Sequence, residues 1–192
     1  MKKYFAAPLL ALPLFVAIVP AFADSLQVAS DDKRIRVEYV EYASPQGNGT
    51  IRGYLAYPWR QDNESVRAPA GLLGRSRPGV LVVHEDGGLT PDVENMVRRL
   101  AADKFIAFAP DARRTAVDRR KAQEDFVAAA SYLKNRRECT GKIGVVGFSD
   151  RGSMAKLLAA LVPDVTAVVS FDGKQPEDED VTRIRKTMRF LR

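Results

Sequence analysis

Four runs of apolar and β-branched residues constrain the fold of this chain more than any other feature of its sequence. The runs are residues 79–84, 105–110, 142–148 and 166–171. Uninterrupted apolar runs of this length are typical of strands buried on both faces, as in a parallel sheet. Because parallel strands need long crossover connections, helices are expected between the runs.

The segments between these runs carry the signals of amphipathic helices. Thr90 and Pro91 are typical of a helix start, and the apolar residues that follow recur at helical spacing. These residues are Val93, Met96, Val97, Leu100 and Ala101. Further helices are predicted over residues 118–136 and after residue 152. Strands alternating with helices predict an α/β fold, with a mostly parallel sheet covered by helices on both faces.

The region before the first run has a different pattern. Residues 34–42 and 50–57 alternate apolar and polar side chains, and residues 44–49 between them are rich in turn formers. This pattern predicts an antiparallel hairpin at an edge of the sheet. The polar stretch 61–77, which contains prolines and glycines, is predicted to be a loop.

The first residues have the three parts of a secretory signal peptide. Lys2 and Lys3 precede an apolar run over residues 4–19, and Ala21-Phe22-Ala23 forms a small-x-small cleavage site. A membrane anchor is the alternative, but the run is short for a span and two prolines interrupt it. We therefore expect a signal peptide over residues 1–23, a domain over residues 24–192, and a periplasmic or secreted protein without a stable membrane anchor after cleavage.

The composition excludes several classes of site. Cys139 is the only cysteine and His84 the only histidine, so zinc-ligand spacing is absent and no internal disulfide can form. The net charge is +6, and much of the basic excess lies in residues 113–121 and 182–192. These stretches lack interleaved aromatic residues or a known binding motif, which favours a solvated face over a nucleic-acid site. We expect no nucleic-acid partner, metal or cofactor.

One candidate nucleophile follows the third apolar run. Ser149 lies in the segment GFSDRG, residues 147–152, between a predicted strand and a predicted helix. A nucleophile elbow occupies this position in α/β-hydrolases, because its sharp turn exposes one side chain above the sheet. The strict G-x-S-x-G pattern is not met, since Arg151 takes the place of the second glycine. The alternative is that Ser149 only caps the helix.

A second candidate segment follows the first apolar run. It contains His84, Glu85, Asp86, Gly87 and Gly88. A turn at this position can supply an oxyanion-hole N–H group and an acidic side chain facing the nucleophile. His84 itself is also consistent with a structural histidine whose ring is hydrogen-bonded at the end of a strand.

Together these segments resemble the dienelactone hydrolase family, specifically its exported bacterial branch. The resemblance extends from about residue 35 to about residue 185, in several segments that follow the order of the family. They are RGYL (52–55), VVHE (82–85) with Gly88 and Leu89, VENMVRRLAADKFIAFAPD (93–111), TGKIGVVGF (140–148) and FDGKQP (171–176).

The resemblance implies an α/β-hydrolase fold and hydrolysis of small-molecule lactones or esters. Ser149 stands at the family's nucleophile position, where cysteine is usual. Glu85 stands where a glutamate modulates the resting nucleophile. The backbone N–H groups of Asp86 and Asp150 would form the oxyanion hole.

The sequence also departs from the family. An α/β-hydrolase triad runs nucleophile, acid, histidine along the chain, and no histidine follows Ser149. A serine nucleophile depends on an adjacent base, because its anionic fraction at neutral pH is negligible. Where the family continues into a buried strand, residues 183–192 are strongly basic. We therefore expect a C-terminally truncated domain that lacks the last strands and helix.

Three hypotheses for function remain open on the sequence. The chain is an ester or lactone hydrolase that uses Ser149 with an unconventional base or one from a partner chain. Alternatively, it is a catalytically inactive remnant of such an enzyme. The third hypothesis, a basic binding module, has only charge to support it.

Overall fold

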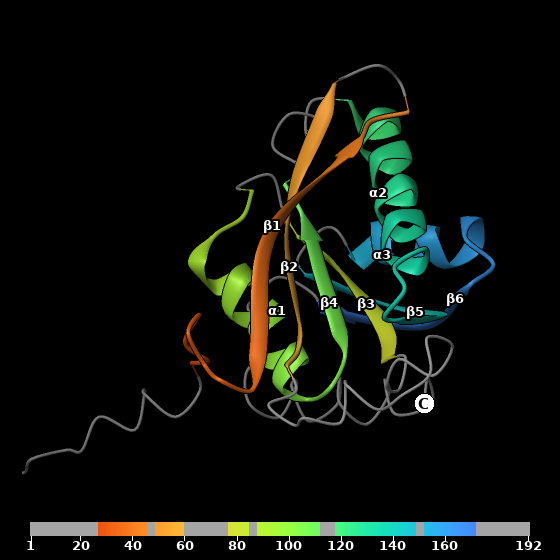
Figure 1. Cartoon of the computed structure of the whole chain (residues 1–192). Coiled ribbons are helices and arrows are strands. Elements are labelled where there is room, and N and C mark those ends of the chain that lie inside the picture. Colours follow the sequence, from red (N-terminus) through yellow and green to blue (C-terminus); the bar gives the residue numbers. More distant parts are fainter. Residues whose placement is uncertain are drawn as a thin grey trace, which may run out of the picture.

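The four apolar runs form the parallel part of a six-stranded mixed sheet in the computed structural model (Figure 1). The structure describes residues 27–45, 49–59, 77–84, 88–111, 118–148 and 152–171. The strands are β1 (Ile35–Ala43), β2 (Thr50–Pro58), β3 (Arg77–Val83), β4 (Ile106–Pro110), β5 (Cys139–Phe148) and β6 (Val165–Phe171). Their order in the sheet is β1-β2-β4-β3-β5-β6. The predicted α/β class and mostly parallel sheet are confirmed.

The predicted hairpin is also confirmed, and it forms one edge of the sheet. β1 and β2 pair antiparallel along their whole length, from Ile35 opposite Pro58 to Ala43 opposite Thr50. β2 then pairs antiparallel with β4, with Gly53 opposite Pro110. A Cβ atom at Gly53 would lie 2.2 Å from Cε2 of Phe108, so this close approach requires glycine.

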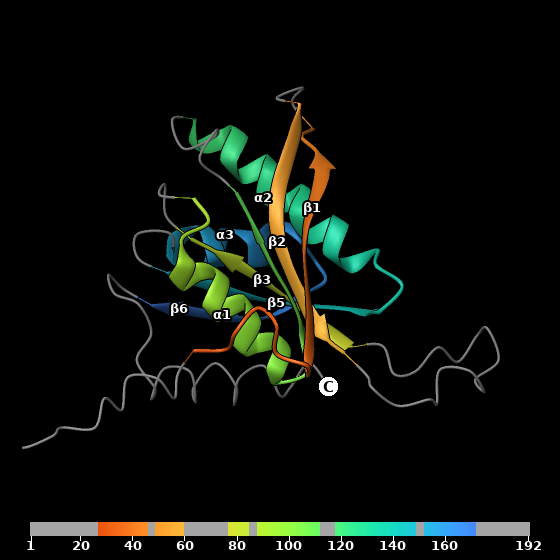
Figure 2. The same cartoon turned by 60° about the vertical axis from the view of Figure 1, so that its left-hand side comes forward.

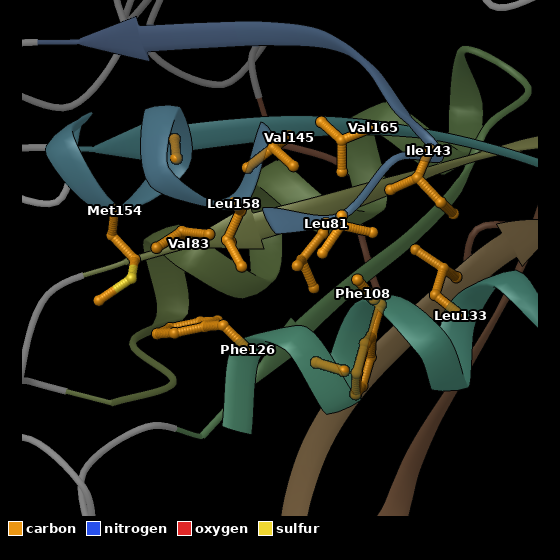
Figure 3. Close-up of a cluster of buried hydrophobic side chains, with 14 of the residues drawn as sticks. Leu81, Val83, Phe108, Phe126, Leu133, Ile143, Val145, Met154, Leu158 and Val165 are labelled. Carbon is orange, nitrogen blue, oxygen red and sulfur yellow. The ribbon is translucent and has the colours of Figure 1, made fainter. Parts of the chain in front are cut away.

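Among the described residues, three helices cover the sheet, and they are divided between its two faces (Figures 1 and 2). The helices are α1 (Pro91–Ala102), α2 (Arg119–Lys134) and α3 (Gly152–Leu161). Alternate residues of β3 lie on the two faces of the sheet. Val80 and Val82 belong to the core under α1, whereas Leu81 and Val83 belong to the core under α2 and α3. Figure 3 shows side chains of the core under α2 and α3. The apolar run of β3 is therefore unbroken because both of its faces are buried.

The predicted helix starts are confirmed where the structure describes them. Thr90 is the N-cap of α1, and its Oγ1 accepts a hydrogen bond from the N–H of Val93 at 3.3 Å. Asp118 is the N-cap of α2. Its carboxylate takes up N–H groups that have no partner within the helix.

Several predicted boundaries were wrong by a few residues. β3 begins at Arg77, inside the predicted loop, because Arg77 pairs with Cys139 across an irregular register. β5 correspondingly begins at Cys139 instead of residue 142, in a polar stretch without a strand pattern. α2 ends at Lys134, not at residue 136.

The segment before β1 is held on α1. The N–H of Val28 donates to Oδ1 of Asn95 at 2.9 Å, and Nε of Arg98 donates to the carbonyl oxygen of Val28 at 2.5 Å. The Val28 side chain packs against the core under α1. Residues 1–26, which include the expected signal peptide, lie outside the described residues. The residues after Phe171 also lie outside them, and the expected loss of the last strands concerns this part of the chain. Within the described part of the chain, no helix combines the length and apolar character needed to cross a membrane.

Candidate active site at the carboxyl end of the central strands

The chain connections single out one place at the edge of the sheet. α1 connects β3 to β4 on one face, whereas α2 connects β4 to β5 on the other face. β3 and β5 are neighbours in the sheet; the connection that leaves β3 runs through α1 to β4 on one side, and the connection that leaves β5 runs through α3 to β6 on the other side. In open α/β sheets, ligands bind at such a switch point, outside the carboxyl ends of the strands.

The register brings together the ends of the two strands that precede the candidate segments. β3 and β5 are paired up to Val83 opposite Gly147. Glu85 and Ser149 each follow this pair by two residues in the sequence. The parallel ladder between β3 and β4, by contrast, has Leu81 opposite Phe108 as its last pair. Pairing at the carboxyl edge is therefore longer on the β5 side of β3 than on the β4 side.

His84 joins the ends of β3 and β4. Its side chain is only 3% exposed, and Nε2 lies 2.7 Å from the carbonyl oxygen of Pro110. A carbonyl oxygen can only accept a hydrogen bond, so Nε2 carries the hydrogen and donates it. This contact supports the interpretation of His84 as a structural histidine at a strand end.

The Pro110 carbonyl group, which accepts this hydrogen bond, belongs to a strand that is also paired with β2. Pro110 pairs with Gly53 of β2, and the N–H of Asp111 donates to the carbonyl oxygen of Arg52 at 2.7 Å. Sequence reasoning missed Pro110 as part of the site. The interaction uses a main-chain carbonyl, which every residue has, so no residue type signals it.

The residues predicted to carry the chemistry lie outside the described residues. They are Ser149, Asp150, Glu85 and Asp86. The elements on either side of Ser149 are nevertheless described: β5 ends at Phe148 and α3 begins at Gly152. Three residues thus separate a buried strand from a helix, which is the strand–turn–helix context of a nucleophile elbow.

Cys139 is remote from this edge, because it is the first residue of β5 whereas the candidate site follows the last. It is half-buried, and burial raises the pKa of its thiol, although backbone N–H groups of Gly141 and Gly79 act in the opposite direction. A raised pKa reduces the thiolate fraction and therefore the reactivity of the thiol. The part of the chain that the structure describes contains no group of three or more potential metal ligands.

The predicted basic stretches contribute little to the described surface. Of residues 113–121, the structure describes only the last few, at the start of α2. Among them, Nε of Arg120 lies 3.4 Å from Oε1 of Glu124 in an exposed ion pair. Residues 182–192 lie outside the described residues. Thus no feature of the described residues other than charge supports a basic binding module.

Comparison with known proteins identifies a matching family and two related proteins. The model of the dienelactone hydrolase family matches residues 111–191. The chain is 42% identical over 101 residues to YghX of Escherichia coli (strain K12), whose name describes a hydrolase fragment; the match covers 53% of this chain and 76% of that protein. It is 30% identical over 146 residues to protein usf of Aquifex pyrophilus, covering 64% of this chain and 56% of that protein.

Solved structures share the fold at lower identity. The structure named m3DLH superposes with a TM-score of 0.58 at 24% identity, over 79% of this chain and 65% of that chain. The dienelactone hydrolase-like promiscuous phosphotriesterase P91, from metagenomic libraries, has a TM-score of 0.55 at 20% identity, over 82% of this chain and 78% of that chain. This chain therefore spans somewhat less than two thirds of m3DLH and just over half of the Aquifex protein.

Proposed function

Because the chain belongs to the dienelactone hydrolase family, we propose that it hydrolyses ester or lactone bonds of small molecules with Ser149 as the nucleophile. The observation that carries this proposal is the three-residue connection between β5 and α3. The connection follows the carboxyl end of β5, and β5 pairs with β3 up to Val83 opposite Gly147, beside the switch point of the sheet.

In the proposed reaction, Oγ of Ser149 attacks the carbonyl carbon of the substrate and the carbonyl oxygen becomes an oxyanion. The backbone N–H groups of Asp86 and Asp150 donate to this oxyanion, and Glu85 modulates the resting nucleophile. The ester oxygen takes up the proton that the Ser149 hydroxyl loses and leaves as an alcohol. Water then releases the acyl group as a carboxylic acid and restores Ser149.

The general base is the component of the proposed site with the least support in this sequence. His84 is the only histidine of the 192 residues, and its Nε2 is committed to the carbonyl oxygen of Pro110. The base is therefore not a histidine that follows Ser149 in this sequence. An oxyanion hole and substrate binding without a complete triad leave a rate about 10³–10⁴-fold above the reaction in water. We expect slow turnover of activated esters on this basis.

The test is hydrolysis of p-nitrophenyl acetate by the purified chain and by its Ser149→Ala variant. Ser131→Ala is the matched control, because Ser131 is an exposed serine on α2. We expect the Ser149→Ala rate to fall well below that of the original chain, while the control keeps the original rate. Equal rates for the original chain and Ser149→Ala would contradict the proposal and favour a catalytically inactive remnant.

We also propose that residues 1–23 direct export to the periplasm or the medium. The support is the signal pattern, together with the hydrogen bonds that hold Val28 on α1 only a few residues after the proposed cleavage site. Expression in a Gram-negative host, followed by N-terminal sequencing of the periplasmic fraction, tests this. A first residue of Asp24 supports export, and retention of Met1 in the cytoplasm contradicts it.

A further inference from the structure

We infer that residues 27–30 form a strap whose docking on α1 is coupled, through Arg98, to the attachment of β1 at the edge of the sheet. Release of the strap, for example by trimming of the chain before β1, would therefore loosen the edge strand as well. This conformational device goes beyond the proposed function, because it depends neither on Ser149 nor on hydrolysis.

The strap is bound through both main-chain groups of one residue. The N–H of Val28 donates to Oδ1 of Asn95 at 2.9 Å, and its carbonyl oxygen accepts from Nε of Arg98 at 2.5 Å. Asn95 and Arg98 are three residues apart on α1, so they lie on the same face of the helix. The Val28 side chain packs against the core under α1. These contacts give the strap one defined position on the helix.

A short, hydrogen-bonded connection joins the strap to the edge strand. The N–H of Asp32 donates to the carbonyl oxygen of Ala29 at 3.2 Å, and the N–H of Ile35 donates to that of Asp32 at 3.1 Å. Ile35 is the first residue of β1. The strap and β1 are therefore consecutive parts of the chain, and α1 contacts both of them.

Arg98 is shared between the strap and the hairpin. Besides the bond to Val28, its Nη1 donates to the Tyr54 hydroxyl of β2 at 3.1 Å and lies 3.7 Å from Oε2 of Glu94. The Arg98 side chain is only 14% exposed. A guanidinium is planar and holds its N–H donors in a fixed geometry. A movement that breaks the bond to the strap therefore also disturbs the contacts with Tyr54 and Glu94.

The same two partners of Arg98 contact β1. The Tyr39 hydroxyl donates to Oε1 of Glu94 at 2.6 Å. The Tyr39 ring also packs edge to face on the Tyr54 ring, with 5.2 Å between the ring centres. A continuous set of contacts thus leads from the strap through Arg98 to the middle of the edge strand. This arrangement predicts that the strap and β1 are released together.

Amide hydrogen exchange, followed by NMR in the full chain, tests the coupling in an Arg98→Met variant. Hydrogen bonds to charged groups are the stronger ones, so we expect the amides of Val28 and of β1 to exchange at least about tenfold faster. The amide of Val145 in the sheet centre should keep its rate. Arg120→Met is the matched control, because Arg120 pairs with Glu124 of its own helix, α2, and it should change neither the strap nor β1.

Two milder variants test the coupling from both ends. Val28→Ala weakens the packing of the strap, and Tyr39→Phe removes the bond between β1 and Glu94. Because coupling is reciprocal, Val28→Ala should accelerate the β1 amides, and Tyr39→Phe should accelerate the Val28 amide, by at least about twofold each. Both cross-effects should disappear in an Arg98→Met background. The connection over residues 31–34 remains in that background, so the comparison separates coupling through Arg98 from coupling along the chain.

Three outcomes would overturn the inference. The first is a Val28 amide that exchanges in the original chain as fast as in a short peptide, which would show that the strap is not docked. The second is a faster Val28 amide in Arg98→Met with unchanged β1 amides. The third is a cross-effect of Val28→Ala that is absent with Arg98 present or that persists without it. Val28→Ala and Tyr39→Phe remove few atoms, so they still decide the matter if Arg98→Met does not fold.

Discussion

The hairpin and the parallel part of the sheet are stabilised in different ways. In β3, every residue from Pro78 to Val83 is buried. In β1, only Ile35 and Tyr42 are buried, and the other residues are exposed or partly exposed. The difference follows from position, because β3 is central and covered on both faces, whereas β1 is an edge strand. Burial is therefore concentrated in the part of the sheet that carries the candidate site.

Directional side-chain contacts stabilise the exposed part of the hairpin, and one of them joins it to α1. The Tyr39 hydroxyl donates to Oε1 of Glu94 on α1 at 2.6 Å, and the guanidinium of Arg52 lies 3.8 Å from the centre of the Tyr39 ring. Arg36 stacks in the same way on the Trp59 ring at 4.0 Å. Exposed contacts of this kind contribute about 0.5–1 kcal/mol each. The exposed residues of β1 thus depend on weak contacts, whereas β3 and most of β2 are held by burial.

The largest expected effect comes from replacing a valine by alanine in each of the two regions. Val82 is fully buried in β3 and Val37 is partly buried in β1, and both contact the core under α1. We expect Val82→Ala to lower the free energy of unfolding by about 2–3 kcal/mol, because two buried methyl groups are lost and a cavity remains. Val37→Ala should cost less than about 1 kcal/mol. Urea denaturation measures both, and equal losses would remove the distinction between the regions.

A smaller effect distinguishes two tyrosines within the hairpin. The buried Tyr42 hydroxyl donates to the carbonyl oxygen of Asp125, and burial raises the pKa of this phenol. We expect Tyr42→Phe to cost about 1–2 kcal/mol, because it leaves a buried carbonyl without this donor. Tyr39→Phe removes a bond at a side chain that is half exposed, so its expected cost is about 0.5 kcal/mol or less. Thermal and urea unfolding of the two variants side by side would show whether burial sets this order.

The smallest expected effect is a pH dependence in the hairpin. The hydrogen bond to Glu94, and secondly burial, raise the pKa of Tyr39 above its ordinary value of 10.0. A raised folded-state pKa stabilises the fold below the unfolded-state pKa, and this contribution is lost as pH rises through the folded-state pKa. The stability difference between the original chain and Tyr39→Phe should therefore be constant between about pH 7 and pH 9 and decline above about pH 10. A difference that grows above pH 10 would contradict this assignment.

The sequence predicted the elements of both regions, but for different reasons. The hairpin followed from alternation and from the turn formers near Gly49, and the parallel strands followed from uninterrupted β-branched runs such as residues 79–84. The start of β5 at Cys139 could not be predicted, since its polar residues are held in the sheet by pairing with β3. Such pairing depends on a partner that is distant in sequence.

The candidate site was predictable only in outline. The sequence located it after the buried strands, and it named His84 as either structural or part of a site. The choice between these roles depends on the carbonyl oxygen of Pro110, a main-chain group that comes close only in the folded chain. The roles of Ser149, Asp150, Glu85 and Asp86 remain predictions, because these residues lie outside the part of the chain that the structure describes.

The position of β4 between β2 and β3 has a consequence for how the chain assembles during synthesis. The hairpin is made first, but the strand that joins it to the rest of the sheet is made only after β3 and α1. Two-stranded hairpins have little stability alone in water, so Tyr54 and Leu55 stay exposed until β4 arrives. The nascent chain consequently presents an apolar, unpaired strand during this interval, which is a natural target for chaperones that bind exposed apolar segments. In this fold, the stretch of chain between β2 and β4 sets the duration of that exposure.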